Sequence, residues 1–160
     1  DDKDRRCIGP AQPIGDREVE RRKPGMGVDD EQDESRLLDR HPRLRVAFLE
    51  AGVTWVPYFI DRLHEHWEKR GDWIPNGWRR DPRTYLESGN VWVSCEPGET
   101  LLPAVVDALG DDSLLYASDY PHWDSEFPDS AKNLRERCDL SPATRAKILG
   151  ENAGRLFGIA

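Results

Sequence analysis

The stretch of sequence that decides the fold is Leu114-Leu115-Tyr116-Ala117-Ser118-Asp119-Tyr120-Pro121-His122-Trp123-Asp124. It opens with a short, continuous apolar run, which is typical of a strand buried on both faces of a parallel sheet. The run ends at Ser118 and Asp119, and the proline that follows indicates a loop. The sequence therefore predicts a buried strand over 114–117 with a carboxylate at its carboxyl end.

Two upstream stretches have the same form. Val46-Ala47-Phe48-Leu49 is followed by Glu50, and Val91-Trp92-Val93-Ser94-Cys95 is followed by Glu96. Apolar residues at helical spacing separate the three predicted strands. The order strand, helix, strand, helix, strand predicts an α/β fold with a parallel sheet, in which ligand sites gather beyond the carboxyl ends of the strands.

The predicted helices have recognisable starts. Thr54 and Thr100 are candidate caps for the first two helices, and Ser141-Pro142 is an N-cap followed by proline at the first helical position. A further helical stretch is predicted near 131–137. The stretch 72–90 is rich in turn-forming residues, so we expect a long loop there.

The N-terminal segment differs in composition from the rest. Residues 1–38 are rich in Asp, Glu, Arg, Pro and Gly and offer only isolated apolar residues. Such a segment cannot bury enough apolar surface to offset its ordering entropy, so we expect it to be disordered or divergent. The predicted domain covers 39–160.

Each predicted strand ends in an acidic residue, namely Glu50, Glu96 and Asp119. A parallel sheet would place these carboxylates on one rim, where they could serve a metal ion or acid/base chemistry. The alternative for each is an acid that faces solvent or caps the next helix.

Three stretches resemble one known family. They are Ala117–Asp124, the closing segment Ile148–Gly158 and the segment His41–Gly52. Together they resemble the C-terminal part of the amidohydrolase-related family (amidohydrolase 2), which includes metal-dependent hydrolases similar to aminocarboxymuconate-semialdehyde decarboxylase. The resemblance implies about three βα units of a TIM-like (β/α)8 barrel, since a complete barrel needs about 200 residues or more.

The resemblance also implies roles for particular residues. Asp119 matches the aspartate after the last barrel strand, which binds a divalent metal and takes part in catalysis. Glu50 stands where many members have a metal-binding histidine, so it is a replacement ligand or an acid that orients another ligand. The implied metal is zinc, with manganese as the alternative. His122 and Trp123 follow Asp119 and are candidate substrate-binding residues.

The sequence departs from the family pattern in its histidines. The family's His-x-His pair after the first strand is absent, because no histidine precedes His41. His64 and His66 do not replace the pair, since helical residues two apart point about 200° apart. The hypotheses are therefore a metal-dependent hydrolase of a small carbonyl or carboxylate substrate, a nonoxidative decarboxylase of such a substrate, or a non-catalytic barrel fragment.

Composition restricts the partners. The formal net charge is −8 and the basic residues are interspersed, which argues against a nucleic-acid-binding face. The sequence has no apolar run of about 18 residues, so we expect no membrane partner and a cytoplasmic location. The three cysteines form no CxxC pattern. Three βα units would expose strand edges and apolar helix faces, so we expect association into a homo-oligomer.

Overall fold

The computed structural model describes residues 37–71 and 80–159. Most of the predicted N-terminal segment, 1–36, lies outside the described residues. Leu37 opens a short helix, α1 (Leu37–Arg40), which leads into the first strand. The last two residues of the segment predicted to be disordered therefore belong to a helical turn.

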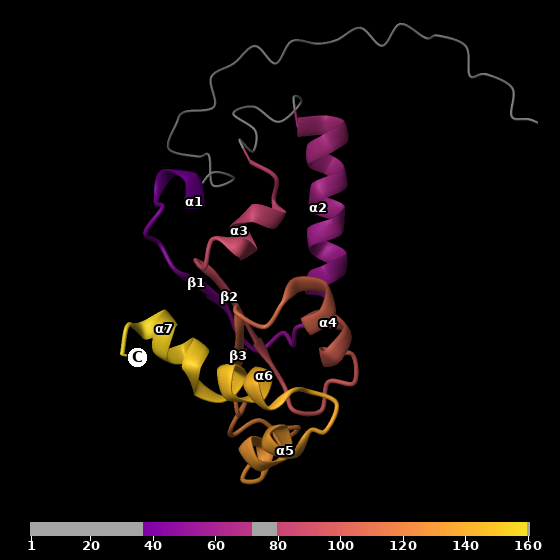
Figure 1. The fold of residues 1–160 in the computed structure, drawn as a ribbon, viewed down its shortest axis with the longest axis vertical. Coiled ribbons are helices and arrows are strands. Elements are labelled where there is room, and N and C mark those ends of the chain that lie inside the picture. Colours follow the sequence, from indigo (N-terminus) through magenta and orange to yellow (C-terminus); the bar gives the residue numbers. More distant parts are fainter. Residues whose placement is uncertain (1–36, 72–79, 160) are drawn as a thin grey trace, which may run out of the picture.

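The centre of the fold is a parallel sheet of three strands in the described part of the chain. The strands are β1 (Val46–Phe48), β2 (Val91–Cys95) and β3 (Leu114–Tyr116), in the order β1-β2-β3. Val46 pairs with Val91, and Val93 pairs with Leu114. Helix α2 (Val56–Arg70) follows β1, and helix α4 (Leu102–Leu109) connects β2 to β3 (Figure 1). The predicted α/β fold of three βα units is confirmed.

The starts of the first two long helices differ from the prediction. Helix α2 begins after Trp55 and helix α4 after Leu101, and neither start has a side-chain cap. Thr54 does not cap α2, because the helix begins two residues later and Trp55 occupies the N-cap position. Thr100 likewise lies one residue before Leu101, which occupies the N-cap position of α4. Both predicted threonine caps are therefore wrong.

The stretch predicted as a long loop, 72–90, contains a helix. Residues 72–79 lie outside the described residues, but α3 (Arg83–Glu87) forms just before β2. Asp81 starts it, because its carboxylate accepts the Arg83 N–H at 3.0 Å and its carbonyl accepts the Thr84 hydroxyl at 2.7 Å. The sequence did not predict this short helix, because the stretch is rich in turn-forming residues.

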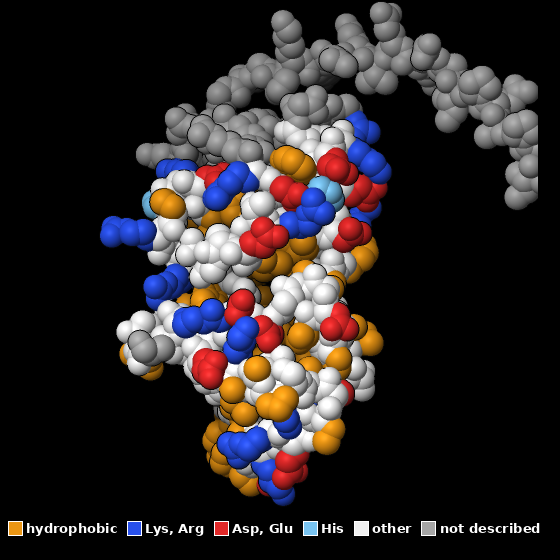
Figure 2. Space-filling model, viewed as in Figure 1, with side chains coloured by type: hydrophobic (Ala, Val, Ile, Leu, Met, Phe, Trp, Pro, Cys, Tyr) orange, Lys and Arg blue, Asp and Glu red, His pale blue; other side chains and the backbone are white. Residues whose placement is uncertain are grey.

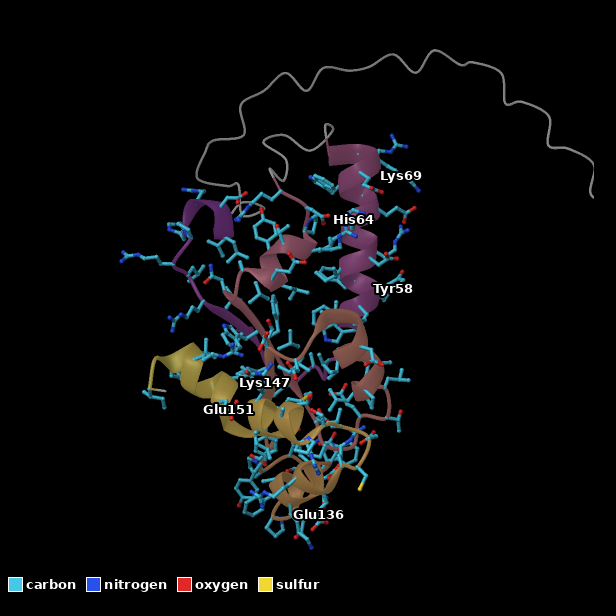
Figure 3. The ribbon with its side chains drawn as sticks, in the orientation of Figure 1. Tyr58, His64, Lys69, Glu136, Lys147 and Glu151 are labelled. Carbon is cyan, nitrogen blue, oxygen red and sulfur yellow. The ribbon has the colours of Figure 1, made fainter. Side chains whose placement is uncertain are left out.

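The C-terminal part is helical, as predicted. Helix α5 (Ser130–Glu136) is followed by α6 (Pro142–Ala146), the π-helical turn η4 (Lys147–Glu151) and α7 (Asn152–Phe157). Ser141 is the predicted cap of α6, since its hydroxyl accepts the Thr144 N–H at 3.0 Å. Figure 3 shows Lys147 and Glu151 along this helical segment and Glu136 on α5.

The core lies between β2, β3 and the helices that cover them. All five residues of β2 are buried, as predicted. Both β1 and β3 are edge strands, but β3 packs against η4 and α7, and its Leu114 and Leu115 are buried. Strand β1 is less buried than predicted, and Phe48 is 46% exposed. Its ring packs edge-on against Trp55, with centroids 6.2 Å apart. The core consists of buried residues from the strands, from α2, α4, α5 and η4, and from the loops before α2 and α6: Val53, Val56, Val93, Cys95, Leu102, Val105, Leu114, Leu134, Leu140 and Ile148.

The surface carries both signs of charge. Figure 2 shows acidic and basic side chains interspersed over the visible face, with apolar side chains between them. No helix in residues 37–71 or 80–159 is long and apolar enough to cross a membrane. Association into a homo-oligomer stays a prediction.

Candidate active site

The loop after β3 holds Asp119 in an unusual backbone conformation. Its φ is 53°, in the left-handed region that costs a non-glycine residue about 1–2 kcal/mol. A turn fixes it, because the His122 N–H donates to the Asp119 carbonyl at 2.8 Å. The Ser125 hydroxyl donates to the Ser118 carbonyl at 2.5 Å and closes the loop. The loop is thus fixed by its own hydrogen bonds, with the Asp119 side chain 15% exposed.

Two side chains from the same loop converge on Asp119. His122 Nδ1 lies 3.2 Å from Asp119 Oδ2 and 3.9 Å from Asp124 Oδ1. Ligand atoms of Asp119, His122 and Asp124 all lie within 4.8 Å of one another. His122 and Asp124 are exposed, whereas Asp119 is mostly covered. The structure therefore brings together the predicted residues Asp119 and His122 and adds Asp124, to which the sequence assigned no role.

Glu96, at the end of β2, lines the same small hollow as Asp119. The hollow has a volume of about 20 Å³ and is also lined by Asp124, Glu126 and Ser130. Partial burial raises the pKa of Glu96, and the negative charges of Glu99, Asp119, Asp124 and Glu126 raise it further. The sequence placed Glu96 on the rim but not in the site, because its neighbours are known only once β2 and β3 pair.

Glu50, at the end of β1, has the same backbone conformation as Asp119, with φ 59°. Its N–H donates to the hydroxyl of Ser94, a buried residue of β2, at 3.1 Å. The Glu50 side chain is exposed, and among the described residues it is not part of the group formed by Asp119, His122 and Asp124. The structure thus fixes the backbone of Glu50 on the rim without bringing its carboxylate to Asp119.

The predicted substrate residue Trp123 and the helix histidines are not part of this group. Trp123 follows Asp119 by four residues and is 94% exposed. His64 lies on α2 with Nδ1 3.2 Å from Asp81 Oδ2 but without hydrogen-bond geometry, and its ring stacks on Trp67. His66 contacts Arg62 instead. The two helix histidines have different partners, as their spacing predicts. The tryptophans at 73 and 78 lie outside the described residues.

The donors at the carboxyl end fit a divalent cation. Asp119 and Asp124 offer carboxylate oxygen and His122 offers imidazole nitrogen, a mixed O/N set that suits manganese or zinc. The hollow beside them adds the Glu96 carboxylate. The set is therefore chemically suited to bind a divalent metal, or to transfer a proton between a carboxylate and an imidazole.

Parallel βα units with acidic residues at the carboxyl ends of the strands are the arrangement of a (β/α)-barrel-type protein, a class whose ligand sites lie on that rim. The chain belongs to the amidohydrolase family, whose model, described as "Amidohydrolase", matches residues 29–159. This match confirms the resemblance of the loop after β3 and of the closing helix.

Solved structures of the same family share the fold. An amidohydrolase from Mycobacterium avium subsp. paratuberculosis K-10 is 27% identical with a TM-score of 0.64, over 78% of this chain and 30% of that chain. The 2,6-dihydroxybenzoate decarboxylase from Rhizobium is 26% identical with a TM-score of 0.58, over 77% of this chain and 37% of that one.

A third similar structure contains a metal. The dihydroxybenzoic acid decarboxylase from Polaromonas sp. JS666, with bound manganese and the inhibitor 2-nitroresorcinol, is 24% identical with a TM-score of 0.57, over 78% of this chain and 37% of that chain. The chain thus spans about a third of the length of these structures. No curated protein sequence matches it.

Proposed function

We propose that this chain supplies the Asp119 side of the active site of a divalent-metal-dependent decarboxylase that acts on a small, aromatic carboxylate. The observation that carries the proposal is the convergence of Asp119, His122 and Asp124 at the end of β3. The relatives from Rhizobium and Polaromonas are decarboxylases of dihydroxybenzoates, which supports this reaction class.

Nonoxidative decarboxylation requires a proton at the carbon that loses carbon dioxide, because the electrons of the broken C–C bond stay on that carbon. A bound divalent cation would polarise the substrate's oxygen atoms. The carboxylates of Asp119 and Asp124 would hold it, with Glu50 as a further ligand candidate on the same rim. The His122 imidazole, with Nδ1 3.2 Å from Asp119 Oδ2, can then deliver the proton. Manganese, bound in the Polaromonas relative, is favoured over the zinc expected from the sequence.

Hydrolysis, the first expectation from the sequence, is the second candidate. The description of the matching family and the relative from Mycobacterium favour it. The same carboxylate and imidazole could take a proton from an attacking water, so the site alone does not separate the two reactions. A chain that binds metal but catalyses neither would be the non-catalytic barrel fragment.

Binding of Mn²⁺ tests the site directly. We expect Asp119→Asn to weaken Mn²⁺ binding, measured by electron paramagnetic resonance, by tenfold or more, because an anionic ligand is lost (about 1.4 kcal/mol per tenfold). Asp129→Asn is the matched control, since Asp129 is an exposed aspartate nearby whose side chain caps no helix. Equal binding by wild type and Asp119→Asn would contradict the metal site.

Release of carbon dioxide from 2,6-dihydroxybenzoate in the presence of Mn²⁺ then distinguishes the reactions. We expect turnover by the wild-type chain, or by the chain supplemented with a polypeptide that carries the remaining barrel units, and none with Asp119→Asn. Turnover of an ester or lactone without decarboxylation would favour the hydrolase instead.

A further inference from the structure

One carboxylate joins the loop after β1 to the loop after β2. Glu99 Oε2 accepts the backbone N–H groups of Val53 at 2.8 Å and Thr54 at 3.1 Å. Its other oxygen, Oε1, accepts the backbone N–H of Glu96 at 2.9 Å. A carboxylate that accepts several backbone N–H bonds makes charge-assisted links, which are stronger than those between neutral groups. The ends of two neighbouring strands are thus fixed to a single side chain.

The surroundings of Glu99 are built for this close contact. Gly52 has φ +60°, and a Cβ there would lie 3.1 Å from Glu99 Oε2. A glycine therefore provides both the left-handed backbone and the space. On the other side, Arg137 Nη1 donates to the carbonyls of Glu99 at 2.7 Å and Pro97 at 2.8 Å. The Glu99 backbone is fixed while its side chain reaches across to the next loop.

Helix capping does not explain this arrangement. Helix α4 begins three residues after Glu99, but its start has no side-chain cap, and the Glu99 carboxylate bonds to 53, 54 and 96 instead. These bonds involve Glu96 and residues that closely follow Glu50, the acidic residues at the carboxyl ends of β2 and β1. Glu50 lies two residues before Gly52, and the backbone of Glu96 is bound directly. Glu96 in turn lines the hollow of Asp119.

We infer that Glu99 is a positioning residue that holds Glu96 beside Asp119 and fixes it to the loop that follows Glu50. This inference rests on the proposed function, because it assumes that the carboxylates of the rim act together on a cation. Both oxygens of Glu99 already accept backbone N–H groups, so Glu99 would act through these bonds rather than as a ligand of the cation.

The test uses Glu99→Gln in the full chain. Glutamine keeps the shape, but its amide NH₂ faces backbone donors and cannot accept from them. We expect hydrogen exchange at the amides of Val53, Thr54 and Glu96 to accelerate about tenfold or more, and Mn²⁺ affinity to fall about tenfold, as for partners of metal ligands. The matched control is Asp111→Asn, which weakens a bridge from a carboxylate to Thr144 and Lys147 before β3.

A double-mutant cycle separates positioning from general loss of stability. If Glu99 acts through Glu96, then Glu96→Gln weakens Mn²⁺ binding less in the Glu99→Gln background than in the wild type. Asp111→Asn should lower the Tm without changing Mn²⁺ affinity. Additive effects of the Glu99 and Glu96 changes, or unchanged Mn²⁺ binding in Glu99→Gln, would overturn the inference. A wild-type chain that binds no Mn²⁺ would overturn the proposed function itself, and the inference with it.

Discussion

Acidic side chains lie at both ends of the parallel sheet, but their surroundings differ. At the amino end, Lys147 Nζ lies 2.7 Å from Asp111 Oδ1 and 2.9 Å from Asp112 Oδ1, and Arg155 also pairs with Asp112. At the carboxyl end, Glu96 and Asp119 share a hollow with further acids and no Lys or Arg. Neutralised charges indicate a structural role, whereas clustered like charges favour a cation or a proton.

Backbone conformation separates the ends in the same way. Both non-glycine residues with positive φ in the described chain, Glu50 and Asp119, follow strands at the carboxyl end. At the amino end, buried Asn152 donates to the carbonyls of Asp111 at 2.7 Å and Leu114 at 2.6 Å. The amino end therefore satisfies its polar groups. The carboxyl end keeps strained residues that local bonds hold in place, such as the bond from the Glu50 N–H to Ser94 and that from the His122 N–H to the Asp119 carbonyl.

The largest expected effect is the loss of stability in Asn152→Ala. The change leaves two carbonyls without their donor and opens a small cavity, so we expect a loss of about 3 kcal/mol in the free energy of unfolding. Urea denaturation measures it. Asn90→Ala is the matched control, because Asn90 is partly exposed and donates only to the Pro42 carbonyl at 2.9 Å. A small effect of Asn152→Ala, with Mn²⁺ binding lost, would break the assignment of the amino end to stability.

The sequence predicts features that depend on local patterns, but not those that depend on contacts between residues far apart in the chain. The three strands were predicted because continuous apolar runs are local signals, and β2 has the predicted bounds, Val91–Cys95. Asp119 and His122 were both predicted as site residues, and they meet because they are three residues apart in one loop. The bonds of Glu99 to Val53 and Thr54 span 46 and 45 residues, so no local pattern reveals them.

An intermediate effect is expected in the pH dependence of stability, with opposite signs at the two ends. Hydrogen bonds from Lys147 and Arg155 hold the pKa of Asp112 below its usual value. Burial raises the pKa of Asp111, but its bonds to Lys147 and Thr144 outweigh burial and lower it. The stabilisation that ionised Asp111 and Asp112 give to the folded state is present above the usual aspartate pKa of about 3.9. It is lost as the pH falls through their lowered pKa values.

Glu96 behaves in the opposite sense, because its raised pKa makes its charged form unfavourable in the folded state. Its penalty is present at neutral pH and is relieved as the pH falls towards the usual glutamate value of about 4.3 and below. We therefore expect Lys147→Met to destabilise and Glu96→Gln to stabilise the chain at pH 7. Both differences should shrink by about pH 3.5, measured by urea unfolding at several pH values. Shifts of the same sign at pH 7 would contradict the comparison.

The smallest expected effect on stability is that of Trp123→Ala. Trp123 is 94% exposed, so its removal should change the free energy of unfolding by less than about 0.5 kcal/mol. If the ring contacts an aromatic substrate beside Asp119, the Kd for 2,6-dihydroxybenzoate, measured calorimetrically with Mn²⁺ present, should rise several-fold, as loss of one aromatic contact of about 1 kcal/mol requires.

Trp55→Ala is the matched control for this change. Trp55 packs against Phe48 and Phe59, with ring centroids 6.2 Å and 5.4 Å away. Its removal should cost about 2–3 kcal/mol of stability, towards the lower end of large-to-small changes because the ring is only partly buried. If Trp123→Ala destabilises the chain as much as Trp55→Ala, the exposed ring serves folding, and the carboxyl end loses its candidate substrate contact.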